Sequence, residues 1–143
     1  MMGLAPVFDG TLAPAGSVRR SLQLFAAFRV EQSDPDHFYS LLAADSIREL
    51  GRWCTVAGSD VLDIGGGPGY FADAFTAAGA RYAGMDPDAG ELTARGSVGA
   101  NMVRASGLTL PMADASIDIA YSSNVLEHVP EPEVMADEMV RVT

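Results

Sequence analysis

The chain has 143 residues, the length of one domain, and 48% of them are hydrophobic, which is enough for a sizeable core. The formal net charge is −10 and lysine is absent, which argues against nucleic acid or an anionic membrane as a partner. A single cysteine excludes an internal disulfide and favours a reducing compartment. No stretch reaches the roughly 20 apolar residues of a membrane helix, and the N-terminus does not resemble a signal peptide. We therefore expect a cytoplasmic protein without a membrane span.

The first 34 residues are predicted to form a separate N-terminal segment, ahead of a main domain at residues 35–143. Residues 1–18 are rich in glycine, proline, alanine and serine, which indicates a loop. Residues 19–30 are partly amphipathic and compatible with a short helix.

Ser33, Asp34 and Pro35 are typical of a helix start, and apolar residues near every 3.6 positions predict a helix over residues 35–52. This helix is expected to pack on a sheet. Two roles stay open for Tyr39 and its neighbours, which either pack in the ordinary way or face a substrate.

A buried strand followed by a glycine turn is predicted at the centre of the chain. Val61, Leu62 and Ile64 form a branched apolar run that suits a parallel strand covered on both faces. Pro68 fits the first position of a helix, which Gly79 can end. Glycines permit positive φ and close approach of a ligand, although a tight turn without a ligand is the alternative. The residues of this loop that we expect to contact a cofactor are Asp63, Gly65, Gly66, Gly67 and Gly69.

The spacing of these glycines separates two classes of nucleotide-binding protein. A dinucleotide fingerprint needs Gly-x-Gly-x-x-Gly, but Tyr70 stands where its third glycine would fall. The pattern Gly-x-Gly-x-Gly after Asp63 instead resembles the S-adenosylmethionine loop of the class I, Rossmann-like methyltransferases. The resemblance implies an α/β fold, namely a three-layer α/β/α sandwich with a parallel sheet, and S-adenosylmethionine as the cofactor.

A second parallel strand is predicted over residues 81–85 and ends at Asp86 and Pro87. Asp86 lies about 20 residues past the glycine loop, where a carboxylate accepts hydrogen bonds from ribose hydroxyls. A helix N-cap is the alternative for Asp86 and the preferred role for Asp88, ahead of a short helix over residues 88–96. Asp86 and Pro87 are therefore candidate cofactor contacts.

A third strand is predicted over residues 101–104, followed by a loop in which this chain departs from the family pattern. Many family members place an aspartate, which accepts from the adenine amino group, where Ser106 stands here. Serine still accepts a hydrogen bond but carries no charge. By resemblance, Ser106, Gly107 and Leu108 are candidate contacts to the base.

The fourth strand is predicted over residues 117–121. The stretch from Val125 to Val129, together with Leu110-Pro111, resembles motifs of methyltransferases that act on small molecules and lipids. His128 is the candidate catalytic base, because an imidazole takes up a proton near neutral pH, or else it orders the loop structurally. Asn124 is a candidate for the cofactor or acceptor side.

The family sheet continues with further strands that usually shape the acceptor pocket, so the C-terminal part of the fold is expected to be missing. The fourth strand would then have an unpaired edge. Two distant histidines and one cysteine make no metal-ligand cluster, and we expect no metal site.

The preferred function is S-adenosylmethionine-dependent methyl transfer to a small-molecule or lipid acceptor. A non-catalytic module that binds this cofactor or a partner protein is the alternative. A nicotinamide dehydrogenase is disfavoured by Tyr70.

Overall fold

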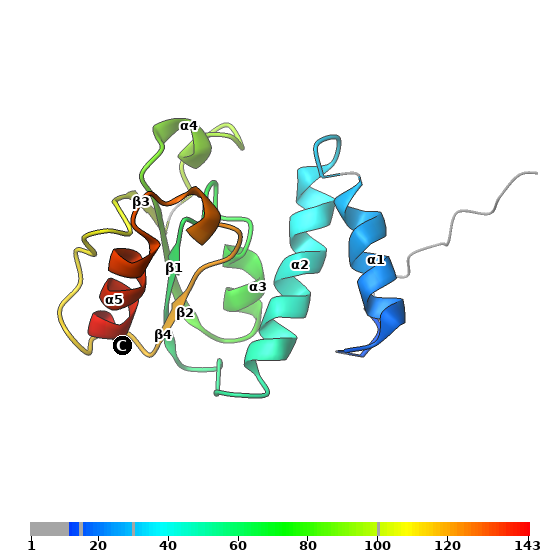
Figure 1. Ribbon diagram of the computed structural model, residues 1–143, viewed down its shortest axis with the longest axis horizontal. Helices are drawn as coiled ribbons and strands as arrows, with labels where there is room; N and C mark the ends of the chain where they lie inside the picture. The colour runs from blue at the N-terminus through cyan, green and yellow to red at the C-terminus, as the bar shows by residue number, and fades with distance from the viewer. Residues whose placement is uncertain (1–11, 15, 30, 100) are drawn as a thin grey trace, which may run out of the picture.

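The computed structural model describes residues 12–14, 16–29, 31–99 and 101–143. The expected loop at residues 1–11 lies outside this part of the chain. The elements, shown in Figure 1, are α1 (Val18–Phe28), α2 (Pro35–Leu50), β1 (Asp60–Ile64), α3 (Ala72–Ala77), β2 (Arg81–Asp86), α4 (Ala89–Leu92), β3 (Met102–Arg104), β4 (Ile119–Tyr121), the 3-10 turn η1 (Leu126–His128) and α5 (Pro132–Val142).

The four strands form one parallel sheet in the order β3-β2-β1-β4. β1 is central and its residues pair with both β2 and β4. In Figure 1, α2 and α3 lie on one side of the sheet and α5 on the other. The predicted three-layer α/β/α arrangement with a parallel sheet is confirmed. β4 is an edge of the described sheet, as expected.

The side chains of β1 alternate between two hydrophobic cores. Val61 packs with Phe75 in the core under α2 and α3, whereas Leu62 and Ile64 pack with Met135 in the core under α5. All three β1 side chains are buried. Burial on both faces explains the apolar residues of this strand, in which Asp63 is the one buried polar residue.

The N-terminal helices pack on each other through apolar and ionic contacts. α2 begins as predicted, with Asp34 accepting a hydrogen bond from the N–H of His37 at 3.1 Å and proline in the first turn. Ala27 of α1 packs against Phe38 of α2. Asp45 of α2 is only 3% exposed and forms an ion pair with Arg20 of α1. These contacts hold α1 against α2.

The helix after the glycine loop begins later than predicted. Gly67 and Gly69 have φ of +53° and +85°, in the left-handed region, so the chain cannot be helical there. The N–H of Gly69 donates to the carbonyl of Gly66 at 2.9 Å, which closes a turn that contains Pro68. The prediction that Pro68 opens the helix is therefore wrong. α3 starts at Ala72 and, as predicted, ends just before Gly79, whose φ is +86°.

Other elements are shorter than predicted. Helix α4 ends at Leu92, and β4 starts at Ile119 because the N–H of Ile117 donates to the carbonyl of Val142 instead of a strand partner. Helix α2 ends at Leu50, before the predicted end at residue 52, and Trp53 beyond it is 84% exposed. Within the described residues, no helix is both long enough and apolar enough to span a membrane.

Candidate active site

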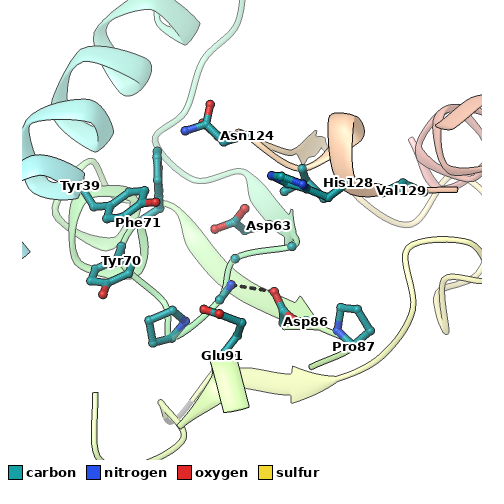
Figure 2. Close-up of a pocket in the computed structure, with 16 residues that line it drawn as sticks. Tyr39, Asp63, Tyr70, Phe71, Asp86, Pro87, Glu91, Asn124, His128 and Val129 are labelled. Atoms are coloured by element: carbon teal, nitrogen blue, oxygen red, sulfur yellow. Dashed lines mark hydrogen bonds between the residues drawn. The ribbon is translucent and has the colours of Figure 1, made fainter. Parts of the chain in front are cut away.

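A cavity of about 400 Å³ opens at the carboxyl ends of β1 and β2. This is where ligands bind in open α/β sheets, and the volume falls within the range of small-molecule sites. Figure 2 shows its lining. Most of the predicted cofactor residues meet here, namely Asp63, Gly65, Gly66, Gly67, Asp86, Pro87 and Asn124.

The glycine loop is fixed to the end of β2 by backbone hydrogen bonds. The N–H groups of Gly65 and Gly66 donate to the carbonyl of Met85 at 2.8 and 3.0 Å. A Cβ on Gly65 would lie 2.4 Å from a methyl of Val125, and φ there is +79°. The loop therefore requires glycine at this position for both its conformation and its contact with the loop after β4.

Asp86 is held rigidly against the glycine loop. Its Oδ2 accepts from the N–H of Gly67 at 3.1 Å, the bond drawn dashed in Figure 2, and its Oδ1 accepts from the N–H of Asp88 at 2.8 Å. A carboxylate oxygen has two acceptor positions, so both oxygens retain capacity for a ligand hydroxyl. Asp88 caps α4, as predicted, by accepting from the N–H groups of Gly90 and Glu91.

Asp63 is a buried carboxyl, 2% exposed, whose Oδ2 accepts from the Tyr82 hydroxyl at 2.8 Å. Burial raises the pKa of Asp63 to about 6, and the negative charge of Asp86 adds to this rise, although the bond from Tyr82 opposes it. A Cβ on Gly66 would lie 2.8 Å from the same Oδ2. Glycine there leaves room for this carboxyl at the cavity wall.

The electrostatic character of the cavity is negative. Asp63, Asp86 and Glu91 all contribute to the lining, and Figure 2 shows their carboxylates facing one hollow. Among the described lining residues there is no arginine. Carboxylates gathered in a partly enclosed site favour a cationic ligand and disfavour a phosphate.

An aromatic wall closes one side of the cavity. Tyr39 of α2 stacks on Tyr70 with ring centroids 4.4 Å apart and an interplanar angle of 13°, and Arg95 lies 5.4 Å from the centre of the Tyr70 ring. Phe71 completes this wall. Tyr39 thus packs against Tyr70 and also lines the cavity, and its contact with a substrate stays a prediction.

The loop after β4 forms the opposite side. The hydroxyl of Ser122 donates to the carbonyl of Ile64 at 2.8 Å and ties this loop to β1. Asn124 has a φ of +57°, and His128 ends η1; both side chains are exposed and line the cavity. In Figure 2 they lie across the hollow from Asp86.

Four of the predicted cofactor residues are not brought to the cavity lining. Gly69 is buried in its turn, and Ser106 is exposed with its Oγ accepting from the N–H of Leu108 at 3.2 Å. Gly107 lies against Ile64, and Leu108 packs at the margin of the core under α5. Their contact with a cofactor stays a prediction.

Several lining residues were not predicted, namely Pro68, Tyr70, Phe71, Glu91, Ser123, Val125 and Val129. Most of them could have been predicted from their position in the sequence. They lie next to the glycine motif, or in the loop after β4 that contains the candidates Asn124 and His128. Glu91 lies in the first turn of α4, shortly after Asp86 in the chain. In the described part of the chain, no three His, Cys, Asp or Glu side chains are grouped to hold a metal ion.

Comparison with known proteins identifies the family. Residues 62–143 match the family model described as a methyltransferase domain. The chain belongs to the methyltransferase domain family. An uncharacterised methyltransferase of Mycolicibacterium gilvum is 49% identical to this methyltransferase domain over 142 residues, which is 92% of the chain and 56% of the relative. The chain spans about half the length of the curated relatives it matches.

Solved structures of other methyltransferases share the fold. An S-adenosylmethionine-dependent methyltransferase from Mesorhizobium loti superposes with a TM-score of 0.56 at 26% identity, over 69% of this methyltransferase domain and 48% of that chain. Magnesium protoporphyrin IX methyltransferase from Synechocystis was solved with bound S-adenosylmethionine. It superposes with a TM-score of 0.52 at 17% identity, over 90% of this chain and 60% of that chain. The family match and these neighbours support S-adenosylmethionine as the cofactor.

Proposed function

We propose that this domain binds S-adenosylmethionine in the cavity at the ends of β1 and β2 and transfers its methyl group to a small-molecule or lipid acceptor. The observation that carries the proposal is the charge of the lining, with the carboxylates of Asp63, Asp86 and Glu91 and no arginine among the described residues there. S-adenosylmethionine has a sulfonium and an ammonium group and is net positive. A nicotinamide dinucleotide has a pyrophosphate, which this lining would repel.

The residues have distinct roles in this proposal. Asp86 accepts from the ribose hydroxyls, since its carboxylate is oriented by two backbone donors. Asp63 balances the positive charge of the amino acid part, and binding of a cation would favour its ionised form. The glycine loop lets the cofactor approach the backbone closely.

Catalysis then depends mainly on positioning. Bound S-adenosylmethionine supplies a methyl group already activated by a positive sulfur. The domain has to hold an acceptor close to that methyl group and in line with it, which lowers the barrier without a dedicated triad. His128 is placed at the mouth of the cavity and takes the proton of an acceptor that must lose one.

A paired calorimetric titration tests the choice of cofactor. We expect saturable binding of S-adenosylmethionine and no binding of NAD⁺ at the same concentrations. Binding of NAD⁺ with no binding of S-adenosylmethionine would refute the proposal. Formation of S-adenosylhomocysteine in the presence of an acceptor panel then separates catalysis from a binding module.

Two further expectations remain proposals. We propose that the chain divides into an N-terminal segment at residues 1–34 and a domain at residues 35–143. We also propose a cytoplasmic location. Limited proteolysis tests the first, since cleavage should concentrate before residue 35.

A further inference from the structure

A second groove, of about 580 Å³, adjoins the proposed cofactor cavity. Tyr39, Asn124 and His128 line both spaces, so the two meet at these side chains. The groove runs between α1, α2 and the loop that contains η1. An acceptor bound there would have its reactive end beside the donor cavity.

The body of the groove is apolar and aromatic. Phe28 of α1 meets Phe38 of α2 edge to face at 5.9 Å, and Phe38 meets Tyr39 at 5.0 Å. Phe25 and Phe28 line the groove although they are 65% and 56% exposed. Several large aromatic side chains gathered at one exposed site are typical of a binding surface for a flat apolar molecule.

The charged groups of the groove have one sign. Glu31 and Glu127 are its carboxylates, and no arginine is found among the described lining residues. Glu31 accepts from the hydroxyl of Tyr39 at 2.8 Å, and burial together with this bond raises the pKa of Tyr39 to about 12. Tyr39 therefore stays a neutral donor. Among the described lining residues, His128 is the one side chain that can become a cation to pair with an anionic ligand.

These features define a class of acceptor. We propose, on the basis of the proposed function, that this groove binds the methyl acceptor and selects an amine with a flat apolar body. The aromatic rings contact the body and, with the carboxylates, favour binding of an ammonium by cation–π and charge attraction. Because an ammonium has no lone pair, it would have to give a proton to His128, which lines both spaces, before its nitrogen could accept the methyl group. Carboxylate and phosphate compounds, including lipids with anionic headgroups, are disfavoured by the same charges.

Matched ligands of one shape and different charge test this selection. We would titrate 2-(aminomethyl)naphthalene, 2-naphthalenemethanol and 2-naphthoic acid into the chain by calorimetry. The amine should bind at least tenfold more tightly than the acid, with the neutral alcohol between them. Equal or tighter binding of the acid would overturn the proposal.

Variants locate the binding. Phe28→Ala should weaken amine binding at least fivefold, whereas Leu22→Ala should leave it unchanged, because Leu22 is 63% exposed on the same helix but does not line the groove. Glu127→Gln should reduce the preference for the amine over the acid. Equal effects of Phe28→Ala and Leu22→Ala would contradict this location. A dimer that Phe28→Ala dissociates, with no probe bound, would show instead that a second copy occupies the groove.

A separate titration with S-adenosylhomocysteine distinguishes the two proposals. Phe28→Ala should bind it as the parent does, because Phe28 does not line the cofactor cavity. If the chain selects the amine but does not bind S-adenosylhomocysteine, the proposed function fails and the groove is not an acceptor site. If it binds S-adenosylhomocysteine without selecting the amine, only the inference on the acceptor fails.

Discussion

The hydroxyl of Tyr82 donates a hydrogen bond of 2.8 Å to Oδ2 of Asp63. The two residues come from neighbouring strands, and both are buried. Burial raises the pKa of Asp63 to about 6 from its ordinary 3.8, so the folded chain binds this proton more tightly than the unfolded chain. Ionisation of Asp63, which lines the proposed cofactor site, therefore lowers the free energy of unfolding.

This relationship predicts a fall in stability as the pH rises. Between pH 3.8 and about 6 the folded state holds the Asp63 proton and the unfolded state releases it, so the free energy of unfolding decreases. The full change is about 3 kcal/mol, at 1.36 kcal/mol per pKa unit. Asp63→Asn lacks this contribution, and urea unfolding should show the variant gaining stability relative to the parent across this window.

A second variant checks the cause. Tyr82→Phe removes the hydrogen bond that lowers the pKa of Asp63 and keeps the carboxyl, so the decrease with pH should become larger. A difference between Asp63→Asn and the parent that does not vary from pH 4 to pH 7 would contradict the assigned pKa.

The close packing of the glycine loop against the loop after β4 predicts that Gly65→Ala disrupts the proposed cofactor site. A methyl group there would lie 2.4 Å from Val125 and strain a φ of +79°. Gly58→Ala is the matched control, since its φ is +83° but nothing lies within 4 Å of the added Cβ. Both variants should lose about 1 kcal/mol from backbone strain. Only Gly65→Ala should also lose binding of S-adenosylhomocysteine, measured by calorimetry.

The ion pairs of Asp45 predict how α1 can be released. This carboxylate pairs with Arg20 of α1 and with Arg48, at 2.6 Å, within α2. Asp45→Asn should cost about 2 kcal/mol, less than the roughly 3–5 kcal/mol of a fully buried pair, because both guanidinium groups reach solvent. Hydrogen exchange should show faster exchange in α1. Unchanged protection there would mean that apolar packing alone holds the helix.

The hydrogen bonds of Arg141 on α5 predict that its removal changes the pKa of Glu138. Arg141 donates to Glu138 at 2.6 Å and to the carbonyls of Leu110 and Met112, which fastens the loop before β4 to α5. The hydrogen bond from Arg141, followed by the one from the N–H of Leu110, lowers the pKa of Glu138 from 4.5 to about 2. This stabilisation is present above pH 4.5 and is lost as the pH falls toward 2. In Arg141→Ala, carbon-detected NMR should show the pKa of Glu138 higher than in the parent.

The sequence predicted those parts of the site that depend on local backbone requirements. Asp63, Asp86 and the glycines lie at the carboxyl ends of neighbouring parallel strands. The pairing of these strands brings them together independently of the conformation of the other loops. Asp34 and Asp88 cap helices because a carboxylate satisfies free N–H groups of the first turn.

The other parts of the site depend on loop conformation and on tertiary contacts. Pro68 was assigned to a helix from its neighbours, but the positive φ of the flanking glycines, which the sequence permits without requiring, places it in a turn. Tyr39 reaches the cavity because α2 packs where it stacks on Tyr70. Ser106 was placed by resemblance alone, and its loop forms a local turn at the surface.

The most direct test of the account is calorimetric titration of S-adenosylhomocysteine into this chain and into Asp86→Ala, with Asp137→Ala as the control. Asp137 is exposed on α5 and does not line the cavity. The control therefore makes the same Asp-to-Ala substitution at a site away from the proposed cofactor. We predict saturable binding by the parent and by Asp137→Ala, and at least tenfold weaker binding by Asp86→Ala. Absence of binding by the parent, with circular dichroism showing a folded chain, would contradict the account.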